Sequence, residues 1–211
     1  MQKITKGNEP PELQKWKRKN PRKHYTHLPD LERRAIRRDC VREQYGLCAF
    51  CCERITADSA SSHNAHLQSQ SRFPQHSLDW VNIVASCNNK ETCGNHQGQA
   101  TPSLSPLMPE CETELRFHIT GRIEGLTDRA RETIELFNLN EKRLCLKRKK
   151  AISDFFYTNE YYPPEEDPVT WGAEIWQEII RQCETPDADG NLAAFAPAFA
   201  GIGRHLLSPS A

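Results

Sequence analysis

The chain has 211 residues, a mean hydropathy of -0.74 and equal numbers of basic and acidic residues, 28 of each. This length allows one domain with an elaborate tail or two small domains, and the polarity predicts a small core. No apolar run approaches the roughly 20 residues that a membrane-spanning helix needs, and the N-terminus contains no apolar signal-peptide segment. The sequence therefore argues against a membrane protein and predicts a cytoplasmic location.

The net charge of zero hides a gradient along the chain. Residues 1–45 include 13 basic and 6 acidic residues, whereas residues 151–211 include 2 basic and 10 acidic ones. The basic front favours a polyanion or an acidic partner, although most charge runs are only solvated surface. The run KWKRKNPRKHY also contains Trp16 and Tyr25, which could stack on bases. We expect an arm over residues 1–25 that orders on binding nucleic acid. The expected phosphate contacts in this arm are Lys15, Lys17, Arg18 and Lys19.

The first predicted helix runs from Leu28 to Tyr45. Pro29 and Asp30 suit its first turn. Its expected inward-facing residues are Leu31, Ala35 and Val41.

The remainder of the chain divides into a polar middle and a patterned second half. Residues 46–100 are rich in cysteine, histidine and asparagine and show weak periodicity. Alternating apolar residues before Gly121 predict a hairpin between Thr113 and Leu126. Helices are predicted at 128–137, 141–156 and 171–183, with a linker at 161–168, and at 191–207 with a break near Pro197. The apolar stripe expected to face the core in the 171–183 helix is Trp171, Ile175, Trp176, Ile179 and Ile180.

Four of the nine cysteines have the spacing of a zinc site. Cys48 and Cys51 form a C-x-x-C pair, and Cys87 and Cys93 follow downstream with five residues between them. The first pair alone could be a redox pair or chance, but two pairs fit a closed tetrahedral zinc site with four thiolates. We expect Cys52 to point away from the metal. The remaining cysteines, which we expect to be packing residues, are Cys40, Cys111, Cys145 and Cys183.

Five polar residues near these cysteines have no place on such a zinc ion. They are His63, His66, Asn82, Asn95 and His96. Because four cysteines complete a tetrahedron, these side chains either have no metal-binding role or serve a second centre.

The order of these motifs resembles the HNH (ββα-metal) endonucleases, and more narrowly the PtuB-like HNH proteins of Septu-type and retron-associated phage defence. The motifs are C-x-x-C, His66 with QSQSRFP, LDWVNIVASC and CGNHQG, and the resemblance extends over residues 1–152. It implies an α+β fold with a small zinc-stapled ββα-metal core. The implied organisation is a basic arm and helix at 1–45, an HNH nuclease core with the tetrathiolate zinc at 46–100, and a hairpin plus a helical C-terminal region at 101–211.

The resemblance also implies roles for the polar residues. His66 would be the general base that takes a proton from the attacking water. Asn82 would hold the loop that orients His66. Either Asn95 or His96 would bind the catalytic divalent ion, Mg²⁺ or Mn²⁺. The expected phosphate contacts near this site are Arg72 and Lys90.

One residue departs from the family pattern. The position before the catalytic histidine is usually acidic, and here it is Ala65. The metal would therefore lose a carboxylate, and His63 could take its place. The consequences left open are low metal affinity, dependence on a partner, or an inactive domain that keeps only its zinc fold.

Two functions of different classes remain at this point. One is a nuclease acting on DNA or RNA, tRNA included, and the other is a catalytically weak, zinc-stapled adaptor that binds nucleic acid or a partner. A redox role for the C-x-x-C pair ranks third, because both cysteines have partners elsewhere. The resemblance implies an ABC/SMC-like ATPase as the controlling partner, and in retron systems a reverse transcriptase with its RNA–DNA hybrid.

Overall fold

The structure, a computed structural model, describes residues 1–158 and 170–208. Over these residues the fold is α+β, as predicted, with seven α-helices and two antiparallel two-stranded sheets. The helices are α1 (Pro11–Lys19), α2 (Asp30–Glu43), α3 (Cys93–His96), α4 (Asp128–Leu136), α5 (Lys142–Thr158), α6 (Ala173–Glu184) and α7 (Ala196–Leu207). The strands are β1 (Ser62–His66), β2 (Ile83–Cys87), β3 (Leu115–Phe117) and β4 (Ile123–Gly125). The linker predicted at 161–168 lies outside the described residues.

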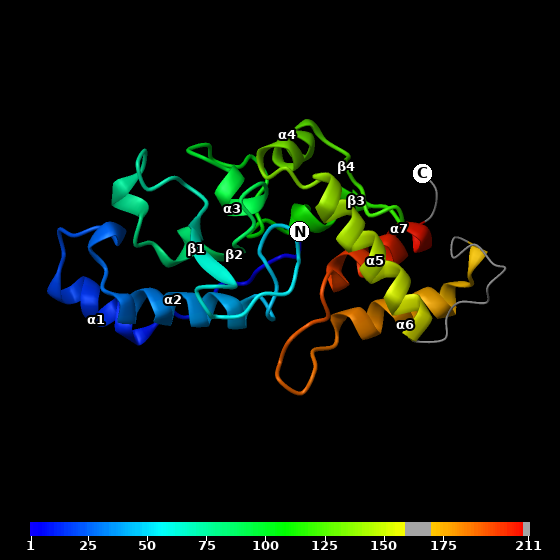
Figure 1. The fold of residues 1–211 in the computed structure, drawn as a ribbon, viewed down its shortest axis with the longest axis horizontal. Helices are drawn as coiled ribbons and strands as arrows, with labels where there is room; N and C mark the ends of the chain where they lie inside the picture. Colours follow the sequence, from blue (N-terminus) through cyan, green and yellow to red (C-terminus); the bar gives the residue numbers. More distant parts are fainter. Residues whose placement is uncertain (159–169, 209–211) are drawn as a thin grey trace.

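The first sheet joins the two halves of the polar middle segment. β1 pairs with β2 so that Ser62 lies opposite Cys87 and His66 opposite Ile83. Helix α2 packs along this sheet, and the short helix α3 contacts both strands. Figure 1 shows the sheet and α2 at one end of the molecule and α5, α6 and α7 at the other.

A buried glutamine closes the outer edge of β2. The side chain of Gln44 accepts from the backbone N–H of Ala85 at 2.7 Å and donates to the Ala85 carbonyl at 2.9 Å. The backbone N–H of Ala49 reaches the same carbonyl at 3.1 Å. Because an unpaired strand edge exposes backbone polar groups, these contacts satisfy the edge and fix the loop that carries Cys48.

The N-terminal segment corrects the expectation of a separate arm. Met1, Ile4 and Leu13 are buried in the common core, and residues 11–19 form helix α1 against α2. Pro11 occupies the start of α1, where proline is tolerated because that N–H has no helical partner. Tyr25 is also buried, so it is not available to stack on bases.

The predicted elements of the second half are present at nearly the expected residues. The hairpin forms as β3 and β4, and the three helical patterns become α4, α5 and α6. Gly121 in the hairpin turn has φ +81°, and a Cβ there would lie 2.1 Å from the Cys145 carbonyl oxygen. Only glycine therefore allows α5 to pack on this turn.

Three details of the predicted helices are wrong. Leu31 is 67% exposed and Ile175 is 39% exposed, because the buried faces of α2 and α6 are narrower than the apolar stripes suggested. Residues 191–195 lie outside α7, which begins at Ala196 with Pro197 in its first turn. Pro197 thus starts the helix instead of breaking it.

Among the described residues, no helix has both the length and the apolar character needed to cross a membrane.

Candidate functional site

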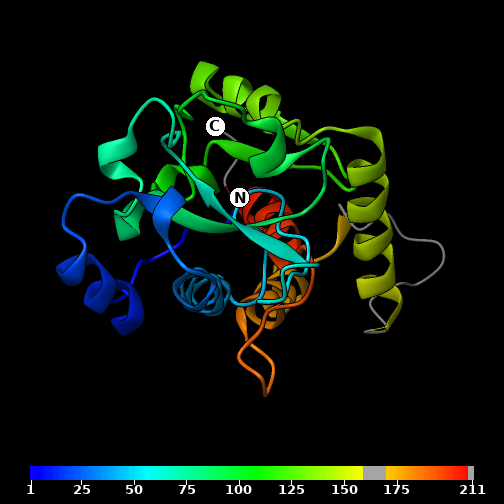
Figure 2. The same ribbon diagram turned by 60° about the vertical axis from the view of Figure 1, so that its left-hand side comes forward.

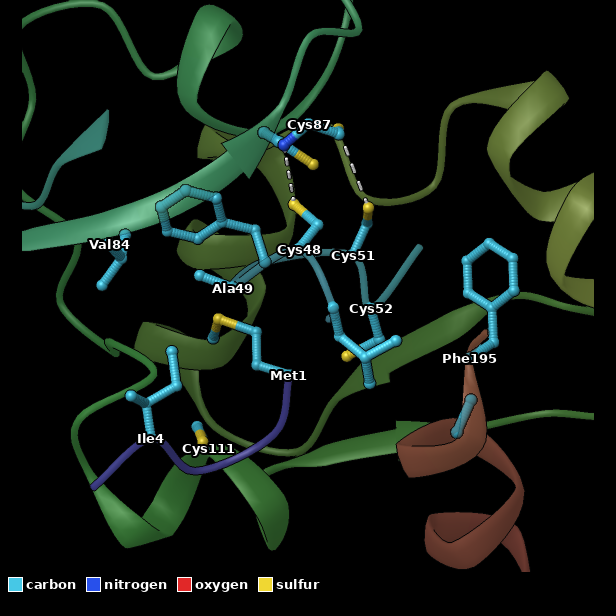
Figure 3. Packing of buried hydrophobic residues seen from close by; sticks show 14 of the residues in the cluster. Met1, Ile4, Cys48, Ala49, Cys51, Cys52, Val84, Cys87, Cys111 and Phe195 are labelled. Carbon is cyan, nitrogen blue, oxygen red and sulfur yellow. Dashed lines mark hydrogen bonds between the residues drawn. The ribbon is translucent and has the colours of Figure 1, made fainter. Parts of the chain in front are cut away.

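Four buried cysteines converge between the sheet and α3. Among the described residues, the sulfur atoms of Cys48, Cys51, Cys87 and Cys93 all lie within 4.8 Å of one another. Figure 3 shows Cys48 and Cys51 directed toward Cys87, with the sulfurs of Cys51 and Cys87 4.0 Å apart. Zinc–sulfur bonds of about 2.3 Å in a tetrahedron separate the sulfurs by about 3.8 Å. The four predicted ligands are therefore brought together, close enough to hold one structural zinc ion.

A tight turn presents the first two sulfurs. The Cys48 N–H donates to the Glu53 carbonyl at 2.8 Å, and the Cys52 N–H donates to the Cys48 carbonyl at 3.0 Å. Cys52 then takes φ +65°, which turns its side chain away from the cluster, as predicted and as Figure 3 shows. Backbone N–H groups of Cys87 and Glu53 donate to Cys48 Sγ and Cys51 Sγ at 3.3 and 3.5 Å. Such donors favour the thiolate form that a metal requires.

The four thiols are electrostatically coupled. Burial opposes ionisation of Cys48, but thiol donors from Cys51, Cys87 and Cys93 outweigh it and hold the pKa of Cys48 well below its usual range. The interaction with Cys48 raises the pKa of Cys51 and of Cys93. A second and third thiolate therefore need a cation between them, which is the condition that a divalent metal ion satisfies.

Arg148 on α5 is a fully buried cation near this cluster. Its guanidinium donates to the carbonyl of Gly121 and, at 3.3 Å, to the carbonyl of Leu139. Among the described residues it forms no salt bridge with a carboxylate, and its Nε has no partner. Burial lowers the pKa of Arg148, while the thiols of Cys51 and Cys93 are among the groups that oppose this. A zinc tetrathiolate has a net double negative charge, which would offset this buried positive charge.

The other cysteines serve packing. Burial raises the pKa of Cys40, Cys111 and Cys183 to about 12, so these thiols stay protonated near neutral pH. Cys145 is only half-buried and lies outside the cluster.

A second arrangement of polar residues lies at the outer end of the same sheet. A pocket of about 370 Å³ is lined by the end of β1, the loop that follows it, and α3 with the residues after it. His63, His66 and Asn95 all line this pocket. Three of the predicted site residues are thus brought together, although up to 32 residues separate them in the sequence.

His66 is buried and held in one orientation. Its Nε2 lies 2.9 Å from the carbonyl oxygen of Ser77, and its Nδ1 lies 3.1 Å from the amide nitrogen of Gln70. Because a carbonyl only accepts, Nε2 carries the proton and Nδ1 accepts from Gln70. Burial, partly opposed by the Ser77 contact, lowers the pKa of His66 to about 4. The ring is therefore neutral near pH 7, and its Nδ1 lone pair is occupied by Gln70, which also lines the pocket.

His63 has the opposite tautomer, which a hydrogen bond from its ring to Asn88 fixes. Its Nδ1 lies 3.0 Å from Oδ1 of Asn88, whose amide nitrogen donates to the Ser59 carbonyl at 2.8 Å. The asparagine oxygen therefore accepts, and Nδ1 carries the proton. The unprotonated Nε2 faces Gly94, where a Cβ would lie only 3.0 Å away. A metal-binding histidine commonly has this kind of second hydrogen bond on its other nitrogen.

Asn82 lies outside the pocket and ties down the loop that follows β1. Its side chain accepts from the Gln68 N–H at 2.7 Å and donates to the carbonyls of Gln68 and His76 at 3.2 and 2.9 Å. These bonds join the two ends of the loop that carries Gln70 and leads to Ser77, the two partners of His66. This geometry is what the loop-holding role expected of Asn82 requires.

The structure separates the two alternatives for the third position. Asn95 lines the pocket and donates through Nδ2 to the Asn89 carbonyl at 3.0 Å. This bond uses the amide nitrogen and not the amide oxygen, the atom that would bind a metal. His96 is outside the pocket lining, and its Nδ1 lies 2.9 Å from the Leu136 carbonyl on the opposite side of α3. Asn95 and not His96 therefore lines the pocket, because consecutive residues of a helix face different directions, and which of the two binds a metal stays a prediction.

Ala65 lies on the wall of the pocket beside α3. Its Cβ would be 2.9 Å from a Cβ at Gly94, so the two residues pack directly together. None of the residues that line the pocket is an aspartate or a glutamate. The site therefore offers a divalent ion neutral imidazole and amide groups.

The predicted phosphate contacts are spread over the surface. Lys15, Arg18 and Lys19 are exposed on α1, whereas Lys17 forms a salt bridge with Glu9 at 2.7 Å. The remaining two, Arg72 and Lys90, are exposed on the loop after β1 and on the turn before α3. None of these six cations lines the pocket.

Three residues around His66 and His63 were missed from the sequence. Tyr25 lies edge-on against the His66 ring, with centroids 4.6 Å apart, and accepts from Asn64 at 2.8 Å. Gln70 and Asn88 set the two histidine tautomers. Gln70 is in the QSQSRFP motif, and its position four residues after His66 was an available signal, whereas Tyr25 depends on tertiary packing.

No protein-family model and no curated protein matches this chain, so the functional assignment depends on the geometry of the site itself.

Proposed function

We propose that this protein is a metal-dependent HNH (ββα-metal) endonuclease that hydrolyses phosphodiester bonds in nucleic acid, DNA or RNA, tRNA included. One observation carries the proposal. Two neutral imidazoles line one open pocket: the unprotonated Nε2 of His63 faces Gly94 on the pocket wall, and the unprotonated Nδ1 of His66 accepts from the amide of Gln70, which also lines the pocket. The β1–β2–α3 order around this pocket, with the four cysteines beside it, supports the same assignment.

His66 is the general base of the proposed reaction. When the Gln70 amide moves aside, Nδ1 accepts the proton of a water molecule that attacks phosphorus. The Ser77 carbonyl accepts from Nε2–H and so stabilises the imidazolium that forms. A pKa of about 4 makes His66 a weak base that is nearly always unprotonated at neutral pH.

His63 and Asn95 would hold the catalytic divalent ion. Such an ion, when bound, polarises the scissile phosphate and stabilises the leaving oxygen. Because the pocket lining has imidazole and amide groups and no carboxylate, we expect Mn²⁺ to bind better than Mg²⁺. Mg²⁺ prefers hard carboxylate oxygens. An acidic residue at position 65 would supply such an oxygen, and Ala65 does not.

The proposal includes a role in antiphage defence under an ATPase partner. The resemblance to Septu-type and retron-associated HNH proteins supports an ABC/SMC-like ATPase, and in retron systems a reverse transcriptase with its RNA–DNA hybrid. Co-expression of the chain with such an ATPase should yield a co-purifying complex. Two proteins that elute separately at micromolar concentration would contradict this part of the proposal.

The direct test is cleavage of labelled duplex DNA and of tRNA with Mg²⁺ or Mn²⁺. His66→Ala should lower the rate by about 10²- to 10⁴-fold, which is the usual contribution of a general base. The control is His118→Ala, because His118 lies on the β3–β4 hairpin and, among the described residues, its side chain bonds Glu124 and no residue of the pocket. Equal rates for the parent and His66→Ala, with both folded, would remove the assignment.

His63→Ala separates metal binding from proton transfer. It should raise the half-saturating Mn²⁺ concentration by about 10- to 100-fold, and the rate should recover at high metal. His66→Ala should stay slow at every metal concentration. If both variants respond alike to added Mn²⁺, the two histidines do not have these separate roles.

A zinc-stapled adaptor without catalysis is the second candidate function. The absence of a carboxylate in the pocket and the bond from Gln70 to His66 Nδ1 favour it. The adaptor predicts nucleic-acid or partner binding that His66→Ala leaves unchanged, with no cleavage in Mg²⁺ or Mn²⁺.

A further inference from the structure

Helix α5 has an unusual charge composition. From Lys142 to Ser153 it includes six basic residues and no acidic one. Five of these cations lie on the exposed face, and the sixth, Arg148, is buried on the opposite side with Leu144 and Ile152. Leu146, 57% exposed, lies among the exposed cations.

Three of the exposed cations form no salt bridge among the residues that the structure describes, although the carboxylate of Glu141, just before α5, interacts electrostatically with Arg143. Lys147 pairs with Glu53, and Lys150 pairs with Asp154 at 2.7 Å. Within the described residues, the other three form no salt bridge; they are Lys142, Arg143 and Lys149. Lys142 and Lys149 are seven residues apart, two helical turns, so they project from the same face about 10 Å apart.

The start of α5 is connected to the wall of the histidine pocket. Just before α5, the Phe137 carbonyl accepts from the Cys93 N–H at 2.8 Å, and Asn138 donates to the Glu91 carbonyl at 2.9 Å. The Leu136 carbonyl accepts from His96 at 2.9 Å. Three hydrogen bonds therefore join the segment before α5 to residues 91–96, which include the pocket residues Gly94 and Asn95.

We propose that the exposed face of α5 binds the sugar–phosphate backbone of a nucleic acid, through Lys142, Arg143 and Lys149. Unpaired cations on a rigid helix, with no acidic residue between them, complement a row of phosphates. The proposal deepens the proposed nuclease function by naming the surface that holds its substrate. It rests on that function only in calling the bound nucleic acid a substrate. Backbone binding itself does not require cleavage.

Helix α1 provides a matched competing surface, because its exposed cations are phosphate contacts that the sequence predicted. It has three exposed cations, Lys15, Arg18 and Lys19, but it packs on α2 at the other end of the molecule. Figures 1 and 2 both show α1 and α5 at opposite sides. Replacing either trio with glutamine removes the same charge and keeps good helix formers.

The experiment measures binding of the full zinc-loaded chain to labelled duplex DNA and to tRNA by fluorescence anisotropy, without Mg²⁺ or Mn²⁺, at several salt concentrations. The α5 variant, with Lys142, Arg143 and Lys149 changed to glutamine, should bind about tenfold more weakly at 0.1 M salt. Its slope of log K against log salt should fall by about 2 to 3. If the backbone lies on α5 and the contacts predicted on α1 are not used, the α1 variant, with Lys15, Arg18 and Lys19 changed to glutamine, keeps the parent slope. Zinc content and thermal unfolding should be unchanged in both variants.

Each other result overturns the proposal. Equal losses in the two variants would show a bulk charge effect, and a loss confined to the α1 variant would place the nucleic acid at α1. If the α5 variant binds nucleic acid as tightly as the parent, α5 has another role. The same conclusion holds if that variant has lost binding to an acidic protein partner. Failure of the nuclease proposal is distinguishable, because a parent chain that binds with the expected slope difference but never cleaves supports the α5 surface alone.

Discussion

The four-cysteine centre and the histidine pocket are two contrasting sites within residues 48–99. In the first, four buried sulfurs lie within 4.8 Å of one another, close enough to hold one metal ion. In the second, His63 is partly exposed, Asn95 is exposed, and both histidines line an open pocket. Closed sets of four ligands hold structural metals, whereas chemistry needs a position that a substrate can reach.

The two constructions share the elements that position them. Cys87 ends β2 and Cys93 begins α3, so the cysteine centre fixes where α3 starts. Gly94 and Asn95 follow at once and form a wall of the pocket. A metal in the closed centre would therefore hold the geometry of the open one, although the ions have different tasks.

The largest expected effect comes from opening the closed centre. Cys48→Ser should lose the zinc, and the chain should become insoluble or unfold, because metal binding in such sites supplies on the order of 10 kcal/mol of folding free energy. Metal analysis of the purified parent should find one zinc per chain.

The matched control is Cys145→Ser, because Cys145 is a half-buried cysteine outside the cluster. It should keep one zinc and the parent thermal stability. Zinc that survives replacement of all four clustered cysteines by serine would contradict the tetrathiolate assignment.

Arg148→Met should have the next largest effect. Without the buried cation, the negative charge of the zinc tetrathiolate is uncompensated, so we expect the unfolding free energy to fall by about 4 kcal/mol. Zinc should also leave faster when a chelator is added. Lys150→Met is the control, since Lys150 is exposed on the same helix and pairs with Asp154. Equal zinc release from the two variants would show that Arg148 does not stabilise the metal centre.

The closed centre was easier to predict from the sequence than the open pocket. Ligand spacing is local, and the pairs Cys48–Cys51 and Cys87–Cys93 are visible without knowing the fold. The apolar patterns of α4, α5 and α6 are also local. By contrast, strand β1 reads SHNAH, because its side chains serve the pocket and α2 and leave no apolar alternation.

The features that were missed depend on distant contacts. The buried Met1 and Leu13 belong to a segment whose charge outweighs its few apolar residues, and only packing on α2 makes it part of the core. Tyr25 meets His66 across 41 positions of sequence. The different surroundings of Asn95 and His96 depend on the orientation of α3, which the motif CGNHQG does not contain.

A smaller effect is expected from the protonation of His66. Its pKa is about 4 in the folded protein, below the roughly 6.5 of an unfolded chain. Between these values the unfolded chain binds a proton that the folded chain does not, so the stability from neutral His66 is full above pH 6.5 and falls as pH falls. Relative to His66→Gln, the parent should lose about 3 kcal/mol of unfolding free energy between pH 8 and pH 4.

Denaturant unfolding of both proteins over this pH range measures the difference. Protonation of the cysteines affects both proteins equally, so it cancels in the comparison. A stability difference that stays constant with pH would mean that His66 titrates normally and is more exposed than the structure shows.

The smallest expected effect comes from Gln70, which distinguishes a pocket ready for reaction from one that must first open. Its amide donates to Nδ1 of His66, the atom that takes the proton in the proposed reaction. Gln70→Ala removes a hydrogen bond worth about 1 kcal/mol, so cleavage at saturating Mn²⁺ should become about fivefold faster. Gln99→Ala is the control, because Gln99 is an exposed glutamine that lines the same pocket. A slower Gln70→Ala variant would show instead that Gln70 positions the His66 ring, and the pocket as it stands would then be the reactive form.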